Sequence, residues 1–423
     1  MGNIQDYKCP NCSGPLIFSA ATQQLKCEYC DSEMALKEFE ELDAILHEVP
    51  VETDYGAYEG EHISDGLQAQ HCDSCGGELI TDGTTVATEC PYCGNTAIVT
   101  KQVTDVLKPD YVIPFKIQKE QAKDILKSFY KKKPLLPKYF ADHNRIDKLT
   151  GAYVPFWLYD CETDSNAVYD ATRVKTWVSG NKRYTRTDYY TVTREGNLDF
   201  EKIPVDGSAK MDNTVMESIE PYNYGDLAPF SMAYLSGFLA DKHDVEFKEL
   251  QPRIDQRVRK SVDKNLRATV KGYSSVTPKS LNVRVKKHHI SYAMFPVWML
   301  NTKWGDKNYN FTMNGQTGNL VGDLPVSKPK AAIFGGGIFS IVSALLILLC
   351  YFGIAIQLGA SLAVGLIVGA AVAGLVVGLM SKKMKSVRMK ADAKNYERNF
   401  RLTKSREYHK GSKTTSVIIQ TSK

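Results

Sequence analysis

The chain has 423 residues, ten cysteines and a formal net charge of +5. This length exceeds the roughly 100 to 200 residues of one compact domain, so we expect two or three units rather than a single globule. The charge is divided, because residues 1–100 hold 18 Asp and Glu against 3 Lys, a balance of −15, and the rest carries +20. Such an acidic first quarter argues against an N-terminal region that binds nucleic-acid phosphates.

The first residues, MGNIQDYKCP, have neither a basic region nor an apolar run of the kind that directs secretion. We therefore expect the N-terminus to stay in the cytoplasm. In a reducing compartment, CxxC pairs are more often metal ligands than disulfides.

Eight cysteines form two sets with one spacing, CxxC, fourteen residues, CxxC. The first set is Cys9, Cys12, Cys27 and Cys30, and the second, 63 residues later, is Cys72, Cys75, Cys90 and Cys93. Ile17 with Ile80 and Tyr29 with Tyr92 repeat at the same offset, which indicates an internal duplication. Four thiolates leave zinc no open position, which is typical of a structural site. We predict two structural Zn²⁺ sites, with solvated or redox-active thiols as the alternative.

The duplication sets the first domain boundaries. Residues 1–48 should form one zinc ribbon and an acidic amphipathic helix packed on it, residues 49–69 a polar linker, and residues 70–105 the second ribbon. The acidic charge, the added negative charge of zinc tetrathiolate, and the lack of a GxxxxGK[ST] loop favour protein partners over nucleic acid.

Residues 106–327 are predicted to be a cytoplasmic α+β domain. Apolar residues at helical spacing predict helices over 117–133 and about 250–270. Strand patterns at 152–161, 166–178, 182–192, 280–300 and 307–323, with turns at Gly180 and Asn314, predict an antiparallel sheet.

We find no catalytic motif in this domain. GxSxG and HExxH are absent, and the histidines are scattered among basic or polar neighbours. Asp226, Asp241, His243 and Asp244 flank the apolar run 229–240 and are the weak candidates for an active site. We expect no catalytic residues and no enzyme activity.

Residues 331–381 contain no charged residue, and 51 residues in one helix would be far longer than a bilayer core of about 30 Å. We predict a hairpin within 328–381, with transmembrane helices at about 332–355 and 358–380. Lysines flank both ends, so the positive-inside rule predicts a two-pass protein of the cell membrane with both termini cytoplasmic.

Ser361, Gly365, Gly369 and Ala373 recur every fourth residue and allow close helix contact. Packing of the two hairpin helices on each other is favoured over an oligomer formed through small-residue faces. Residues 382–423 are predicted to be a basic cytoplasmic tail, either solvated or attracted to anionic lipid.

The cysteine repeats resemble zinc ribbons of the transcription-factor-IIB type. With the terminal hairpin, the order of elements resembles bacterial zinc-ribbon membrane proteins encoded beside phage-shock-type envelope-stress proteins and virion-core-like, band-seven-related proteins. The resemblance implies that the chain recruits such protein partners to the membrane.

We therefore expect a multidomain protein of two tandem zinc ribbons, an α+β domain and a transmembrane hairpin. The leading functional hypothesis is a non-enzymatic membrane scaffold or adaptor, with a role in the envelope-stress response. The alternative is a membrane-tethered nucleic-acid-binding or transcription-related zinc-ribbon protein, and an undetected enzyme in the middle domain is the third.

Overall fold

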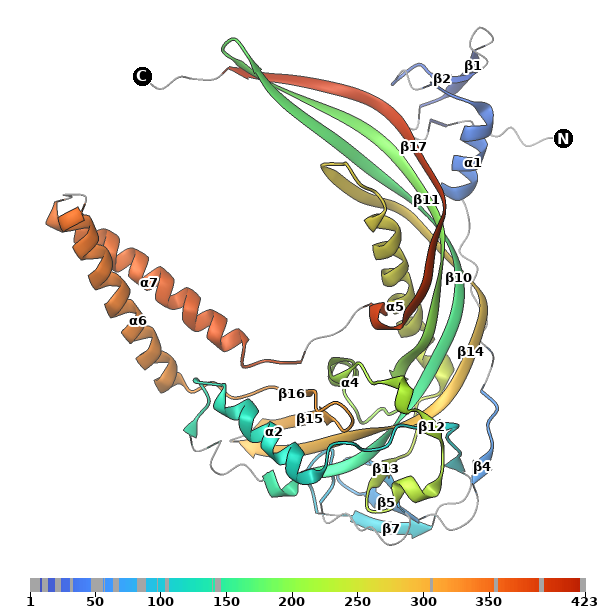
Figure 1. Ribbon diagram of the computed structural model, residues 1–423, viewed down its shortest axis with the longest axis vertical. Coiled ribbons are helices and arrows are strands. Elements are labelled where there is room, and N and C mark those ends of the chain that lie inside the picture. The colour runs from blue at the N-terminus through green and yellow to red at the C-terminus, as the bar shows by residue number, and fades with distance from the viewer. Residues whose placement is uncertain are drawn as a thin grey trace.

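The protein is described from a computed structural model. The described residues are 8–9, 14–19, 24–30, 33–46, 56, 58–63, 68–81, 89–96, 98–102, 106–138, 140, 146–304, 307–353, 357–387 and 392–418. Figure 1 shows a tall curved sheet with most of the short elements at its base and a helical hairpin that projects from that base, while the N-terminal unit (residues 16–46) lies beside the opposite end of the sheet.

Four long antiparallel strands, called the arch, dominate the molecule. They are β10 (Thr150–Ser179), β11 (Lys182–Asp206), β14 (Ser275–Trp304) and β17 (Glu397–Ile418), in the order β17-β11-β10-β14. The predicted turn at Gly180 is confirmed and has φ 60°. The strands predicted separately at 152–161 and 166–178 form one continuous strand.

Burial changes along β10. Residues 151–159 are buried on both faces, whereas residues 174–179 are exposed on both. The pairing has register shifts near Tyr159, Glu162 and Val168, and such irregularities bend a sheet and increase its twist. The base of the arch is therefore a packed core, while its far end extends beyond that core.

Short strands widen the sheet at its base. They are β9 (Tyr111–Val112), β12 (Ala228–Pro229), β13 (Leu239–Asp241), β15 (Lys307–Asn314) and β16 (Leu320–Gly322), and β4 (His62–Ile63) pairs with β8 (Val106–Leu107) in a separate ladder. The pairings of β13 with β10 and of β9 with β14 are parallel. The predicted antiparallel sheet is therefore confirmed for the four long strands. The sheet as a whole is mixed, because short strands from distant parts of the chain join it in parallel.

Helices cover this sheet. They are α2 (Lys119–Lys131), α4 (Asn213–Ile219) and α5 (Phe247–Ala268), with short 3₁₀ turns η1 (Ile146–Lys148), η2 (Tyr224–Asp226), η3 (Met232–Leu235) and η5 (Lys394–Tyr396). The two helices predicted from apolar spacing, α2 and α5, are confirmed. α5 lies inside the arch (Figure 1), where Ile254, Val258 and Val262 pack into the same core as Trp157 and Tyr169.

Each cysteine set lies in a small β unit. Ribbon 1 comprises β1 (Leu16–Ser19), β2 (Gln24–Cys27), β3 (Glu33–Met34) and α1 (Leu36–Leu46); ribbon 2 comprises β5 (Gln68–Cys72), β6 (Glu78–Thr81), β7 (Ile98–Gln102) and the knuckle at residues 89–96. Phe39 of α1 packs with Leu25 and Met34, so the expected packing of the acidic helix on its own ribbon is confirmed. Most of the predicted linker 49–69 lies outside the described residues.

Two apolar helices, α6 (Lys328–Leu348) and α7 (Leu358–Lys382), form a hairpin, with a π-helical turn at η4 (Leu349–Gly353). Both are long and apolar enough to cross a membrane. The buried residues of α7 are the predicted small-residue stripe Ser361, Gly365, Gly369 and Ala373. A Cβ on Gly369 would lie 2.1 Å from the Ser343 hydroxyl of α6, so the stripe is where the two helices meet.

Two predicted domain boundaries do not separate units. Within the predicted tail 382–423, Glu397–Ile418 is strand β17 and pairs with β11 along almost its whole length, so this part belongs to the sheet. Ribbon 2 is not an independent domain either, because β6 pairs with β13 of the body. Both errors have one cause: pairing between strands more than a hundred residues apart leaves no local pattern in the sequence.

Candidate metal centres

The two CxxC turns of ribbon 2 have the same backbone geometry. The Gly76 N–H donates to the Cys72 carbonyl and the Gly94 N–H donates to the Cys90 carbonyl, each at 2.8 Å. Both glycines have positive φ, 71° and 75°, a conformation that glycine adopts without strain. Each turn therefore presents its two thiols on one side.

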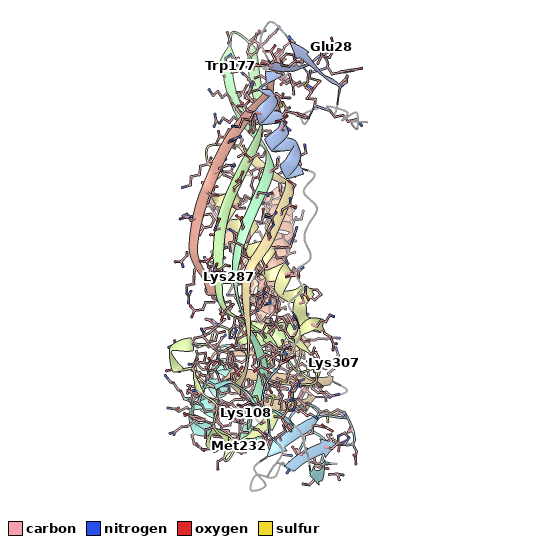
Figure 2. The ribbon with its side chains drawn as sticks, turned by 90° about the vertical axis from the view of Figure 1, so that its right-hand side faces the viewer. Glu28, Lys108, Trp177, Met232, Lys287 and Lys307 are labelled. Carbon is pink, nitrogen blue, oxygen red and sulfur yellow. The ribbon has the colours of Figure 1, made fainter. Side chains whose placement is uncertain are left out.

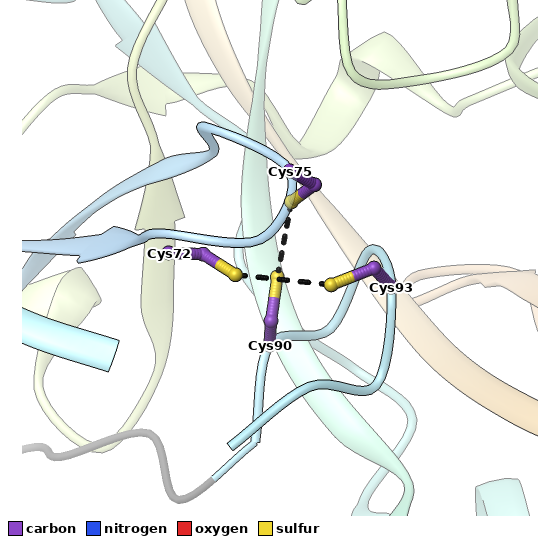
Figure 3. A group of neighbouring side chains, drawn as sticks. All are labelled: Cys72, Cys75, Cys90 and Cys93. Atoms are coloured by element: carbon purple, nitrogen blue, oxygen red, sulfur yellow. Dashed lines mark hydrogen bonds between the residues drawn. The ribbon is translucent and has the colours of Figure 1, made fainter. Parts of the chain in front are cut away.

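The four thiols of ribbon 2 converge on one point (Figure 3). The Sγ atoms of Cys72 and Cys93 are 3.7 Å apart, and those of Cys75 and Cys90 are also 3.7 Å apart. A zinc tetrathiolate with Zn–S bonds of about 2.3 Å has S–S edges of about 3.8 Å. These two edges match those of a tetrahedral zinc site, and all four Sγ atoms lie within 4.8 Å of one another.

The electrostatic surroundings of these thiols also fit a bound cation. Burial opposes ionisation of Cys72, but hydrogen bonds from the backbone N–H groups of Cys75 and Ser74 and from neighbouring thiols together outweigh it, and the pKa of Cys72 lies below its ordinary value. Burial raises the pKa of Cys75 and of Cys90. Four neighbouring thiolates therefore need a divalent cation to balance them, and binding of the cation would release protons.

In ribbon 1, three cysteines of the corresponding set lie together among the described residues. The Sγ atoms of Cys9, Cys27 and Cys30 lie within 4.8 Å of one another, and Cys9 and Cys30 are 3.6 Å apart. Cys12 lies outside the described residues. Both clusters are compatible with zinc, and His71 belongs to neither of them but lies 3.7 Å from Glu78.

The duplicated ribbons differ in how their sheets are completed. In ribbon 1, β1 pairs with its own β2, with Ile17 opposite Lys26. In ribbon 2, the equivalent β6 pairs with β5 on one edge and with β13 on the other, with Ile80 opposite Ala240. A strand of the body therefore takes the place that β2 has in ribbon 1.

The second knuckle of ribbon 2 also docks on the body. The Tyr92 hydroxyl is buried and faces the Asp241 carboxyl, without a hydrogen bond of standard geometry. The Asn301 side-chain amide donates to the Tyr92 carbonyl at 2.7 Å, and the Lys210 ammonium donates to the Cys75 carbonyl at 3.0 Å. These contacts fix the thiol cluster against the base of the arch.

The equivalent surface of ribbon 1 is open. Tyr29, the counterpart of Tyr92, is 77% exposed, and Ile17 is 50% exposed where its counterpart Ile80 is only 4% exposed. One copy of the duplicated module is therefore built into the body, and the other presents the same side chains to solvent.

Asp244 lies within electrostatic range of Asp241 and of His243, but the candidates for an active site are engaged in structural contacts. Asp226 pairs with Lys116 at 2.6 Å, and Asp244 accepts a hydrogen bond from the Ala209 N–H at 2.6 Å. Burial lowers the pKa of His243. Burial raises the pKa of Asp241 to about 7, and this residue serves the docking of ribbon 2.

A shallow depression lies where the arch bends, and sequence reasoning did not identify it. Two of its carboxylates form ion pairs with basic side chains: Glu162 lies 3.3 Å from Lys287, and Glu201 lies 3.2 Å from Arg398. These ion pairs tie neighbouring strands together. The two basic residues come from β14 and β17, which are far apart in the chain, so no local pattern in the sequence indicates the depression.

Sequence reasoning also missed a buried ionic cluster beneath α5. Arg257 lies 2.8 Å from Glu220, and the Tyr396 hydroxyl donates to the same carboxylate at 2.8 Å. Tyr396 follows the helical hairpin and precedes β17, so this cluster anchors the returning chain. Arg257 lies within the apolar stripe of α5, which is the one sequence signal that it is buried.

Together the fold and the thiol clusters define a sheet-rich protein with two candidate zinc ribbons and a pair of apolar C-terminal helices. The chain is 34% identical over 335 residues to YdjG of Bacillus subtilis (strain 168), which is described as an uncharacterized protein. The match covers 79% of this chain and 94% of the relative, so the chain belongs to the same family as YdjG. No family model matches the chain, and no solved structure matches it.

Proposed function

We propose that the protein is a non-enzymatic scaffold that is anchored in the cell membrane and recruits protein partners through ribbon 1. The observation that carries the proposal is the contrast between the two ribbons. Ribbon 2 uses β6 and Tyr92 to dock on the body, whereas the matching Ile17 and Tyr29 of ribbon 1 are exposed.

Ribbon 1 is suited to present this surface. It supplies its own β2 and its own helix, and Leu25, Met34 and Phe39 form a small core within the ribbon. Exposed aromatic side chains on a rigid, metal-stapled turn lose little conformational entropy on binding, which makes them effective contact residues. Zinc in both clusters would be structural, because four thiolates leave no position for a substrate.

The anchor is proposed to be the hairpin α6–α7. β11 precedes the hairpin in the chain and β17 follows it, and the two strands pair from Lys182 opposite Ile418 to Phe200 opposite Glu397. Strands of one sheet lie on one side of a bilayer, so this pairing supports two crossings. Lys328 and Lys382, at the two helix ends, favour the cytoplasmic side by the positive-inside rule.

The partner class follows from the resemblance of the ribbons and the hairpin to zinc-ribbon membrane proteins of the envelope-stress type. Phage-shock-type or band-seven-related proteins are therefore the partners to test first. A role in the envelope-stress response is part of this proposal.

The proposal is tested by co-purification from detergent-solubilised membranes. Tyr29→Ala should reduce recovery of the bound protein about tenfold or more, as expected for a central aromatic contact. Tyr189→Ala is the matched control, because Tyr189 is also an exposed tyrosine, 40% accessible, but lies on the arch. Equal recovery with both variants, at unchanged zinc content, would remove ribbon 1 as the binding site.

A further inference from the structure

The far end of the arch carries apolar side chains that no core requires. The arch tip is defined as residues 174–187 and 411–418, contributed by β10, β11 and β17. Its exposed large apolar residues, with their exposed fractions, are Val174 (43%), Trp177 (43%), Val178 (58%), Val417 (70%) and Ile418 (62%). Exposed clusters of this kind mark interaction surfaces.

The two aromatic residues of the tip stack on each other. The Trp177 and Tyr184 rings are stacked with centroids 5.5 Å apart and an interplanar angle of 10°. The pairing Trp177 opposite Tyr184 places both rings on one face of the hairpin. Figure 2 shows Trp177 at the upper end of the molecule, near the height of Glu28 of ribbon 1 and far above the packed base.

The tip is also strongly basic. It contains five Lys and Arg and no Asp or Glu; the basic residues are Lys175, Lys182, Arg183, Arg186 and Lys413. Arg186 pairs with Asp188, next to the tip, at 2.7 Å, which leaves four cations for a partner. The register places Arg183 between Val178 and Val417, and it places Lys182 next to Ile418. Cations therefore alternate with aliphatic side chains across the strands.

We propose that the arch tip binds the anionic headgroup surface of the bilayer that holds α6–α7. Tryptophan and tyrosine prefer the interface between headgroups and acyl chains, and Lys and Arg are attracted to anionic lipid. Aliphatic residues between the cations gain from entering that interface. The inference rests on the proposed membrane anchor and adds a second, peripheral contact to it.

The position of the tip supports a bilayer as the partner. In Figure 1 the arch opens toward the side on which α6 and α7 project, and its tip lies on that side. The hairpin base is fixed to the body, because the Leu324 N–H donates to the Met384 carbonyl at 3.0 Å and the Gly322 N–H donates to the Ser386 hydroxyl at 2.8 Å. The body and its arch are thereby kept close to the membrane.

A polynucleotide would use the cations but not the aliphatic residues. Phosphate contacts come from Lys and Arg, and stacking comes from aromatic rings. Val178, Val417 and Ile418 are each 58% exposed or more and would gain nothing in such a complex. Lipid is the partner that uses all three kinds of side chain.

The test uses the full chain reconstituted into vesicles with brominated acyl chains, either neutral (phosphatidylcholine) or containing anionic phosphatidylglycerol. The chain has four tryptophans, so the signal of Trp177 is obtained as the difference between the wild type and Trp177→Phe. We expect bromine to quench the Trp177 signal in the anionic vesicles. Lys182→Gln with Arg183→Gln should weaken this contact roughly 25-fold, at about fivefold per charge.

Val178→Ser with Val417→Ser is the second variant and should reduce quenching while leaving all charges in place. Near-ultraviolet circular dichroism checks that each variant is folded. If the protein floats with the vesicles but Trp177 is not quenched, the contact of the arch tip with lipid is refuted while the membrane anchor stands. Failure to float would overturn the anchor and the contact together, and a Trp177 signal that responds to duplex DNA but not to brominated lipid would identify a polynucleotide surface instead.

Discussion

Loss of one zinc ligand should have very different consequences in the two ribbons. Cys90→Ser removes a ligand from ribbon 2, whose strand β6 and knuckle are part of the body. Cys27→Ser removes the equivalent ligand from ribbon 1, which completes its own sheet. We expect Cys90→Ser to destabilise the body and Cys27→Ser to leave it unchanged.

The magnitude follows from what ribbon 2 buries. Leu79 and Ile80 are 2% and 4% exposed, and Tyr92 inserts its hydroxyl beside Asp241. Withdrawing the two buried side chains at about 1.5–3 kcal/mol each gives a loss of about 3–6 kcal/mol, to which the half-buried Tyr92 adds. This is a large share of the 5–15 kcal/mol that stabilises a typical domain, so the body of Cys90→Ser should unfold at far lower denaturant.

The assay is urea unfolding of the detergent-solubilised protein, followed by the near-ultraviolet dichroism of the buried Trp157 and Trp298 of the arch. Zinc analysis should show one site lost in each variant. Equal unfolding midpoints for Cys90→Ser and Cys27→Ser would refute the reasoning, because they would mean that ribbon 2 contributes nothing to the body.

Three further predictions concern the body and the hairpin. Asp241 has a pKa of about 7 when folded and about 4 when unfolded, so the folded state holds an extra proton between these values and the free energy of unfolding should fall as pH rises, by at most about 1.4 kcal/mol per unit. Asp241→Asn should flatten that part of the pH profile, measured by urea midpoints; an unchanged slope would count against it. Glu220→Ala leaves the buried Arg257 without its partner and should cost about 3–5 kcal/mol in urea unfolding, and a cost below 1 kcal/mol would contradict the ionic cluster. Gly369→Leu should separate α6 from α7 and lower the thermal midpoint in detergent, whereas Gly378→Leu, where a Cβ meets open space, should not; equal midpoints would argue against this helix contact.

Local patterns predicted the parts of the fold that are local. The apolar spacing of α2 and α5, the turn at Gly180 and the hairpin with its Gly365 and Gly369 contact face are all in the structure as expected. Cysteine spacing placed the thiols of ribbon 2 correctly, because a CxxC turn sets the directions of its own side chains.

Long-range pairing could not be predicted in this way. The strand β17 is rich in Lys, Arg, Ser and Thr, and without its partner β11 it has the composition of a solvated tail. The duplication predicted two similar ribbons, but the difference between Tyr29 and Tyr92 depends on β13, which lies about 150 residues further along the chain. Whether a knuckle is buried or exposed is decided by the tertiary structure around it.

The most direct test of the scaffold function is photo-cross-linking in living cells, with a photoreactive amino acid at position 29 and, as the control, at the exposed position 189. The proposed function predicts a protein adduct of defined mass in the membrane fraction at position 29, absent at position 189 and lost when Cys27→Ser disrupts ribbon 1. No adduct at position 29, or the same adducts at both positions, would contradict a partner-binding role for ribbon 1.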